Sequence, residues 1–486
     1  DCEGSSGYPF GIGVGREPMT SGLLVLLAYS AALVAFGVWV GRRVEGARGF
    51  FVADRRLGPL LLFATILAAN IGAGSTVGAA GIAYRDGLSA WWWVGSAGIG
   101  TLLLALWIGP RIWRIASENG LLTMGDYLTL RYGRSIRAMI AVLLWFATLT
   151  IVASQLIAMA EIVGVVTDQP RWVGALIGGA LVIIYFSVGG LVGSAWVNLV
   201  QLIVLTLGFA IALPWALSGA GGWGAVKDVG LGSSDDYLNF WHGGSSGLIY
   251  LALLGPAFII SPGLVQKVYG AVNERAIRVG LVAAGIGLMV FAFAPTLIGM
   301  IARVHAPDLL NPERALPILL TTGLPPAVGM LGLAAVFSAE VSSADAGLFM
   351  LSTSLSKDLY KGYLRPEASD AQVLRVARLG AIVGGLLGVL LALLLDSVIS
   401  SLTIFYSLLS VSLFIPVAAG LHSRRAGEIE AWAAIGTGLA ALAAVRLFVP
   451  EGAPPIVDGT LMGLVVSAFA FTIVLAFRNK KRKGMI

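Results

Sequence analysis

The sequence has few charged residues and few of the side chains on which metal or disulfide chemistry depends. Only 12% of its 486 residues are charged, whereas 57% are hydrophobic and the mean hydropathy is +0.88. A single cysteine, Cys2, excludes a disulfide framework and any cysteine-based metal site. Three histidines, His242, His305 and His422, argue against a zinc or haem centre. The composition excludes a soluble domain and indicates a membrane protein.

Catalytic motifs are also missing. The chain has no HExxH, no GxSxG in a strand–turn–helix context and no GxxxxGK[ST] phosphate loop. A Ser/His/Asp set would have to use histidines that fall in loops or at the ends of apolar segments. We therefore expect no enzyme, and no organic cofactor. We interpret the net charge of +6 as a topology signal rather than a nucleic-acid footprint.

Apolar segments of transmembrane length recur along the whole chain and predict an all-α integral membrane protein with thirteen spans. The expected limits are 22–40, 59–80, 88–109, 137–164, 172–190, 194–217, 246–264, 278–302, 325–351, 374–395, 399–420, 429–448 and 456–477. We expect three parts: a short external segment at 1–20, one transmembrane domain at 21–480, and a basic tail at 481–486. Translation from Met19 is an alternative account of the first residues. The longest external loop, 218–245, is expected to be a lid or a plain connector.

Basic residues fall mainly in alternate loops, which predicts the orientation in a cell membrane. The positive-inside rule places these loops and the C-terminus in the cytoplasm and the N-terminus outside. The basic residues are Arg42, Arg43, Arg48, Arg55 and Arg56 after the first span, Arg111, Arg114, Arg131 and Arg134 after the third, Lys267 and Arg275 after the seventh, Lys357, Lys361 and Arg365 after the ninth, and Arg424 and Arg425 after the eleventh.

The segment 333–360 combines an apolar, small-residue helix with two carboxylates, Glu340 and Asp345. Charge inside a membrane helix is costly and almost always faces the protein interior or a water-filled cavity. At about 100° per residue, Ala339, Ser342 and Ser343 share one stripe of the helix, and the two acids flank it. The stripe predicts a cation site. The alternative is a packing face, because serine and alanine let helices approach closely.

Two predicted spans are interrupted. Asn70, Gly72 and Gly74 interrupt the second span, and Gly255-Pro256 followed by Ser261-Pro262-Gly263 interrupts the seventh. Paired interruptions at a five-span offset are typical of transporters built from inverted repeats. The alternative is that glycine and proline are simply common in membrane helices.

The interrupted spans also suggest where a solute binds. The residues predicted to line its pocket are Asn70, Gly72, Ser75, Gln155 and Phe258. Trp91, Trp92 and Trp93 are expected either to stack on a solute or, more commonly, to belong to an interfacial aromatic belt.

Four segments together resemble the sodium/solute symporter family. They read FFVADRRLGP at 50–59, LLTMGDYLTLRYG at 121–133, GGLVGSAWVNLVQ at 189–201, and the serine helix that ends in KDLY at 357–360. The resemblance extends over about residues 20–480. It implies a LeuT-like five-plus-five inverted repeat, with core repeats at about 59–217 and 246–420, one helix before them and two after.

The resemblance also implies ion ligands. The main sodium site would use the carbonyl groups of Ala68, Ile71 and Ala339 with the hydroxyl groups of Ser342 and Ser343. Oxygen ligands of this kind suit a hard cation.

A second ion site departs from the family pattern. The segment that usually reads WTD is Trp196-Val197-Asn198 here, and the usual hydroxyl position is Asp345. We expect Asp345, Asn198 and Glu340 at a second cation or proton site.

The expected function is therefore sodium-coupled symport of a small organic solute, such as a sugar, an amino acid or a carboxylate, by alternating access. One alternative is proton-coupled symport through Asp345 or Glu340, and alternatives of another class are a transporter-like membrane sensor or a channel. The lipid bilayer is the expected environment, and no protein partner is inferred.

Overall fold

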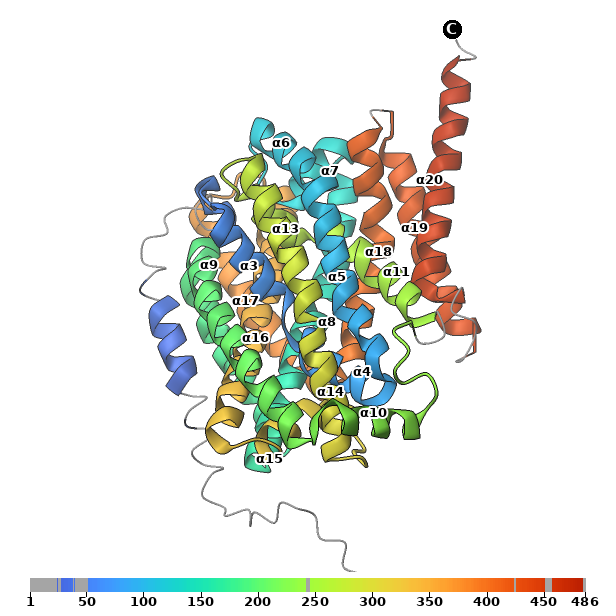
Figure 1. Cartoon of the computed structure of the whole chain (residues 1–486). Coiled ribbons are helices and arrows are strands. Elements are labelled where there is room, and N and C mark those ends of the chain that lie inside the picture. The colour runs from blue at the N-terminus through green and yellow to red at the C-terminus, as the bar shows by residue number, and fades with distance from the viewer. Residues whose placement is uncertain are drawn as a thin grey trace, which may run out of the picture.

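The computed structural model describes residues 24, 28–37, 39, 51–241, 245–423, 425–450 and 457–483. Within these residues the protein is a bundle of helices, apart from one isolated β-bridge between Leu57 and Ala271 (Figure 1). The predicted segment 1–20, the loop residues Arg42, Arg43 and Arg48, and the last three residues of the tail lie outside the described residues.

The helices follow one another with short connections. In the first half they are α3 (Pro59–Asn70), α4 (Val77–Asp86), α5 (Trp91–Leu103), α6 (Gly109–Asn119), α7 (Met124–Tyr132), α8 (Arg134–Thr167), α9 (Arg171–Gly219) and α10 (Gly222–Ser233). In the second half they are α11 (Ser245–Ile260), α12 (Pro262–Tyr269), α13 (Glu274–Phe291), α14 (Phe293–His305), α15 (Ala315–Thr322), α16 (Pro326–Thr353), α17 (Asp370–Leu394), α18 (Val398–His422), α19 (Glu428–Phe448) and α20 (Gly459–Lys483).

Ten helical stretches among the described residues are long and apolar enough to cross a membrane, so the chain is a multi-pass membrane protein. Three shorter apolar helices, Ala28–Gly37, Pro59–Asn70 and Arg171–Ile184, fall on the first, second and fifth predicted spans. The fifth and sixth predicted spans lie within one helix, α9. At 1.5 Å per residue, its 49 residues would extend about 73 Å, more than two bilayer cores.

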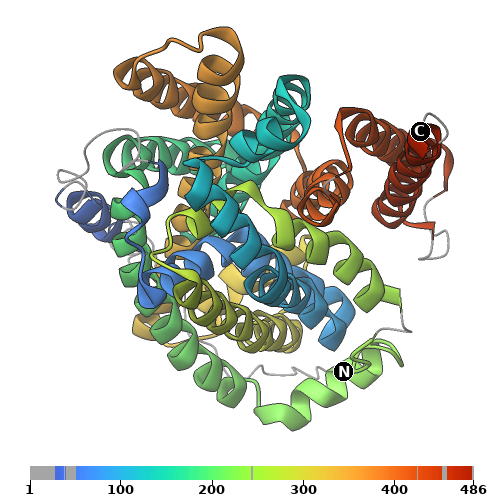
Figure 2. The same ribbon diagram turned by 90° about the horizontal axis from the view of Figure 1, so that it is seen from above.

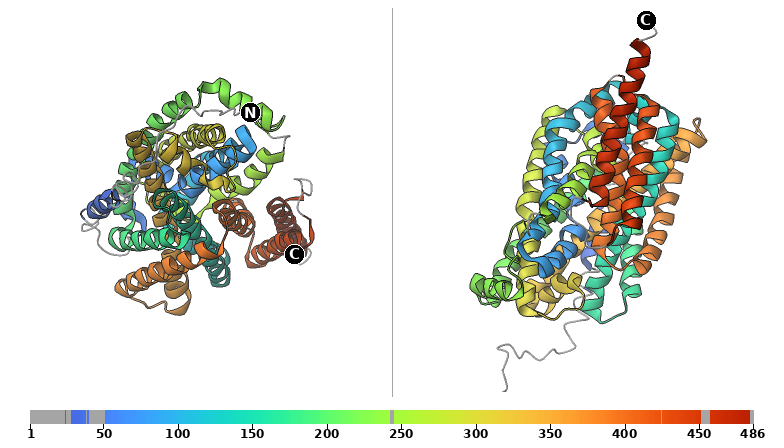
Figure 3. Two further views of the ribbon diagram at one scale, coloured as in Figure 1. Left: turned by 90° about the horizontal axis from the view of Figure 1, so that it is seen from below. Right: turned by 90° about the vertical axis from the view of Figure 1, so that its right-hand side faces the viewer.

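The helices that carry the predicted ion site lie in the middle of the bundle. Helix α16 packs on α8, α9 and α3, and most of its residues are buried. Helices α19 and α20 pack on each other at the rim, as the view from above shows (Figure 2). The side view shows α20 running along the outside of the bundle (Figure 3). The centre of the bundle is therefore the part shielded from lipid.

Both predicted spans are interrupted, but the second is broken at only one of its two predicted positions. Helix α3 ends at Asn70, Ile71 and Gly72 are extended, and α4 begins at Val77. The prediction of a break at Gly255-Pro256 was wrong, because α11 continues through both residues. The break is at Ser261, whose ψ of 121° leaves the helical region, and Pro262 begins α12. Proline is favoured at a first helical position, where its missing N–H costs nothing.

The three tryptophans of α5 are buried within the protein, with exposed fractions of 2–8%. Trp91 and Trp92 pack against Phe240, and Trp92 also packs against Trp241 in the connection after α10. That connection therefore seals one end of α5, and packing in the protein interior explains Trp91 and Trp92.

Candidate functional site

The centre of the site is the contact between Ser343 and the broken helix pair α3–α4. The Ser343 hydroxyl lies 3.1 Å from the carbonyl oxygen of Ile71 and 3.2 Å from that of Ala69. The Ile71 carbonyl is free for this contact because the helix has ended one residue earlier. Ala68 and Ala339 are both buried, with exposed fractions of 3%. An unbroken helix thus presents a hydroxyl to the carbonyl groups of a broken one.

Polar side chains around the break satisfy the other freed backbone groups. Gln155 accepts a hydrogen bond from the backbone N–H of Ala73 at 2.8 Å, and Ser75 donates one to the carbonyl oxygen of Asn70 at 2.8 Å. Gly72 lies so close to Ser343 and Gln155 that an added Cβ would overlap both side chains. Gln155, Ser75 and Gly72 therefore shape the break, and their predicted contact with a solute stays a prediction.

The second predicted cluster is a chain of hydrogen bonds between α16 and α9. Ser342 donates to Asn198 Oδ1 at 2.9 Å, and Ser194 donates to Asp345 Oδ2 at 2.7 Å. Asn198 Nδ2 lies 3.4 Å from Ser194 Oγ and 3.1 Å from Thr65 Oγ1 of α3. Asn198 and Asp345 are thus brought into one network, with Ser194 between them.

Glu340 lies apart from this network. It is fully buried and accepts a hydrogen bond from Thr76, just before α4, at 2.7 Å. Its second oxygen, Oε2, has no hydrogen-bond partner among the described residues. Glu340 and Asp345 therefore face different helices, as their opposite flanking positions on the stripe predict.

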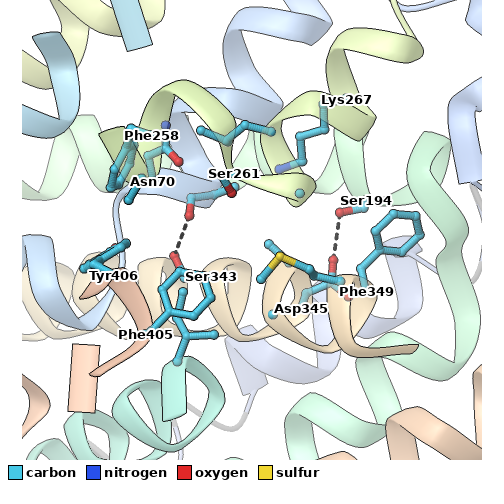
Figure 4. A pocket seen from close by; sticks show the side chains of 18 residues that line it. Asn70, Ser194, Phe258, Ser261, Lys267, Ser343, Asp345, Phe349, Phe405 and Tyr406 are labelled. Atoms are coloured by element: carbon cyan, nitrogen blue, oxygen red, sulfur yellow. Dashed lines mark hydrogen bonds between the residues drawn. The ribbon is translucent and has the colours of Figure 1, made fainter. Parts of the chain in front are cut away.

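A cavity of about 60 Å³ adjoins the first site. Figure 4 shows Asn70, Phe258 and Tyr406 at one end of it, and Lys267, Ser194 and Asp345 at the other. Of the five predicted solute residues, Asn70 and Phe258 line this cavity, whereas Gly72, Ser75 and Gln155 are not among its lining residues. Asn70 Nδ2 is buried without a hydrogen-bond partner in the described part of the chain, so a donor remains available there.

Lys267 was assigned to a cytoplasmic loop, and this assignment was wrong. It lies in α12 with an exposed fraction of 4%, and its ammonium group donates to the carbonyl oxygen of Thr65 at 2.9 Å. The sequence did carry a signal, because Val265, Val268 and Tyr269 around it are apolar. The predicted end of the seventh span, at residue 264, therefore described this lysine less well than its apolar neighbours did.

Figure 1 shows α6 and α7 at one end of the bundle, and two of the family-like segments meet beside α7. Arg137 of α8 pairs with Asp126 of α7 and with Asp358, both at 2.9 Å. Thr123 donates to the same Asp358 oxygen at 2.6 Å. This cluster accounts for the polar residues Thr123 and Asp126 of the TMGDYL segment and Asp358 of the KDLY segment. It gives these residues no role in ion binding.

Comparison with known proteins identifies this arrangement. The chain has the fold of a Na+-coupled sialic acid symporter, with a TM-score of 0.76 at 20% identity over 94% of this chain and 97% of the other. It is also similar to MhsT in complex with L-phenylalanine, with a TM-score of 0.51 at 14% identity over 86% and 98% of the two chains. These likenesses show a LeuT-like fold, on which a broken helix faces a serine helix.

Residues 50–435 match the model of the sodium:solute symporter family, and the chain belongs to that family. It is 27% identical over 479 residues to the sodium/pantothenate symporter of Escherichia coli (strain K12), covering 91% of this chain and 94% of that protein. It is 26% identical over 410 residues to the sodium/glucose cotransporter of Vibrio parahaemolyticus, covering 74% and 72%. The match to the human high affinity choline transporter 1 covers 75% of this chain and 66% of that protein, at 26% identity.

The family membership confirms the expected function class: the protein is a sodium-coupled solute symporter and not an enzyme.

Proposed function

We propose that this chain takes up a small organic solute together with sodium, and that sodium binds between α16 and the break after α3. The ligands are the carbonyl oxygens of Ala68, Ile71 and Ala339 with the hydroxyl oxygens of Ser342 and Ser343. The observation that carries the proposal is the Ser343 hydroxyl on the Ile71 carbonyl, at 3.1 Å. Neutral oxygen ligands at an interrupted membrane helix are typical of sodium sites in transporters.

The solute is proposed to bind in the adjoining cavity, close to Asn70 and Phe258. Ligand pockets usually enclose roughly 300–1,000 Å³, much more than the 60 Å³ of this cavity. We therefore expect the helices around it to move apart before an organic solute enters. Such a movement is what alternating access requires. Sugars, pantothenate and choline are candidates because the relatives are named for glucose, pantothenate and choline.

The proposed orientation places the α6 and α7 face in the cytoplasm. Figure 1 shows the end of α20 at that same face and α10 and α15 at the opposite one. Arg111 and Arg114 lie on α6 and Arg131 lies on α7, so positive charge supports this orientation. The inverted repeats at about 59–217 and 246–420 are proposed on the same grounds, since both contain a broken helix.

The test begins with a thermal-shift screen of the purified chain against candidate solutes, with and without sodium. A solute that binds only the folded transporter raises its apparent stability. We expect stabilisation by the true solute to be larger in sodium than in potassium. Uptake of that solute into proteoliposomes should then require an inward sodium gradient. Uptake that is driven equally well by a pH gradient without sodium would reject the sodium proposal.

Proton coupling is the second candidate, and one observation favours it. Glu340 is fully buried, and among the described residues no basic side chain pairs with it. An unpaired carboxylate in such a place is costly unless it takes up a proton. The same uptake assay distinguishes proton coupling from sodium coupling, because Glu340→Gln would abolish proton-driven uptake but leave sodium-driven uptake intact.

A further inference from the structure

The cavity beside the sodium site contains a positive side chain. Lys267 and Asp345 both line it and lie at the same end (Figure 4). Lys267 is buried, and its ammonium group donates to the Thr65 carbonyl oxygen at 2.9 Å. A buried charge in the membrane region is costly and marks a functional position by default.

The groups around Lys267 form the network in which a second cation was predicted. Asn198 Nδ2 lies 3.1 Å from Thr65 Oγ1, so an amide donor occupies this space as well. The other amide atom, Asn198 Oδ1, already accepts the hydroxyl of Ser342. A sodium ion needs oxygen lone pairs directed at one point. Here an ammonium group and an amide N–H₂ group are both directed at Thr65, beside the network.

The charges also argue against a second sodium ion in this network. An ionised Asp345 contributes one negative charge and a protonated Lys267 one positive charge, so the two together leave this part of the cavity balanced before any ion enters. A further sodium ion would leave an uncompensated positive charge in a buried site, which is costly. The first site, at Ser343 and Ile71, lies on the edge of the serine stripe away from Asp345, and its proposed ligands are neutral.

We propose that the Lys267 ammonium is a tethered cation that takes the place of a second sodium ion. The protein then couples one sodium ion to each solute molecule, and the positive charge of Lys267 in the same cavity balances Asp345 in place of a transported ion. This inference rests on the proposed sodium site, which supplies the single transported ion. It also explains Asn198: with an aspartate there, the network would carry a net negative charge and attract a second ion.

The experiment counts sodium ions on the purified full chain with radioactive ²²Na⁺ as the only ligand, by equilibrium dialysis at saturation. We expect one ion per protein in the natural chain and two in Lys267→Met, because the Asp345 charge is then unpaired. Lys267→Met combined with Asp345→Asn should return the count to one. The matched control is Lys361→Met, which removes a lysine at the protein surface that pairs with Asp370, and its count should stay at one.

Two further variants keep the test decisive if Lys267→Met does not fold. Lys267→Arg keeps the charge and should bind one ion, whereas Asn198→Asp adds a negative charge and should bind two. Two ions on the natural chain, or one ion on every variant, would overturn the tethered-cation proposal while leaving the sodium site intact. No saturable sodium on the natural chain would instead overturn the proposed function itself.

Discussion

At the scale of single residues, two neighbouring serines of α16 have different partners. Ser343 contacts the broken helix, whereas Ser342 donates to Asn198 across the interface with α9. Side chains one position apart point about 100° apart on a helix. One stripe of small polar residues therefore serves two networks.

We predict that Ser343→Ala and Ser342→Ala both weaken sodium binding, each by roughly tenfold if one ligand is worth about 1.4 kcal/mol. Both variants should fold, because alanine is tolerated in close helix packing. The measurement is the sodium concentration that gives half-maximal thermal stabilisation. Ser352→Ala is the control, since that buried hydroxyl only donates within its own helix, to Phe349, at 3.0 Å. Unchanged sodium dependence in both ligand variants would place the site elsewhere.

The candidate site was predictable from sequence where residue type and helical phase suffice. Ser342, Ser343 and the interrupted helix at Asn70 needed only the 3.6-residue period and the poor helix propensity of glycine. Lys267 was not predictable in this way, because its partner Thr65 is 202 residues away along the chain. Partners of that kind depend on the packing of α12 against α3, which no local pattern describes.

At the scale of the elements, the break after α3 depends on close approach. Gly72 lies in extended backbone with its φ at −148°, so its glycine character is needed for space rather than for a special dihedral. The Gln155 side chain is 2.6 Å from where a Cβ would be, and the Ser343 side chain is closer still. Any side chain at this position must push α16 or α8 away.

We predict that Gly72→Ala strongly reduces sodium-dependent solute uptake, by tenfold or more if the misfit costs the 1–3 kcal/mol typical of overpacking. The physical reason is displacement of Ser343 from the Ile71 carbonyl. The measurement is the initial uptake rate in proteoliposomes at matched protein content. Gly436→Ala in α19 is the control, because no atom lies within 4 Å of its added Cβ. Normal uptake by Gly72→Ala would show that the break tolerates a side chain.

A second element, the start of α18, is held by an acid from a different segment. Glu313 accepts the backbone N–H groups of Val398 at 3.1 Å and Ile399 at 3.3 Å. Burial raises the pKa of Glu313 above its ordinary value of 4.5, although these two hydrogen bonds oppose the shift. Because the folded pKa is raised, the stability from this group is present below pH 4.5 and is lost as pH rises through the folded pKa.

We predict that Glu313→Gln removes this pH-dependent loss of folding stability. The stability of the variant relative to the natural chain should increase from pH 4.5 upwards and level off above the folded pKa of Glu313. Thermal unfolding midpoints of both proteins between pH 4 and pH 8 measure the difference. Glu367→Gln, at an exposed position, should run parallel to the natural chain. Parallel curves for Glu313→Gln as well would contradict the assignment.

The elements themselves were largely predictable, and the errors have physical causes. Apolar length is a strong signal, so most predicted spans coincide with helices. The predicted break at Pro256 was wrong because a membrane helix can continue through a proline when neighbouring groups satisfy the freed carbonyl. Helix α9 is continuous, so it has no break between the fifth and sixth predicted spans. The residues between those spans, 191–193, contain a glycine but no stronger turn signal.

At the scale of the whole molecule, the two proposed repeats are joined at the α6 and α7 face. Arg137 belongs to the first repeat and Asp358 to the second, and their side chains are 8% exposed at a separation of 2.9 Å. Asp126 of the first repeat shares the same arginine. A cluster of this kind closes one end of the bundle, whereas the proposed sodium and solute sites lie at its centre. Its charges must separate if the bundle opens at that face.

We predict that Arg137→Gln destabilises the protein by about 3–5 kcal/mol, because it leaves two carboxylates in a buried place without a positive partner. Arg137→Gln combined with Asp358→Asn should be more stable than Arg137→Gln alone, since one of the stranded charges is then removed. Unfolding of the purified chain in denaturant measures both, and the double-mutant comparison isolates the pair. Arg114→Gln breaks an exposed pair with Glu274 and should have little effect. If Arg137→Gln proved no more harmful than Arg114→Gln, the cluster would not hold the two repeats together, and another contact would have to close this face.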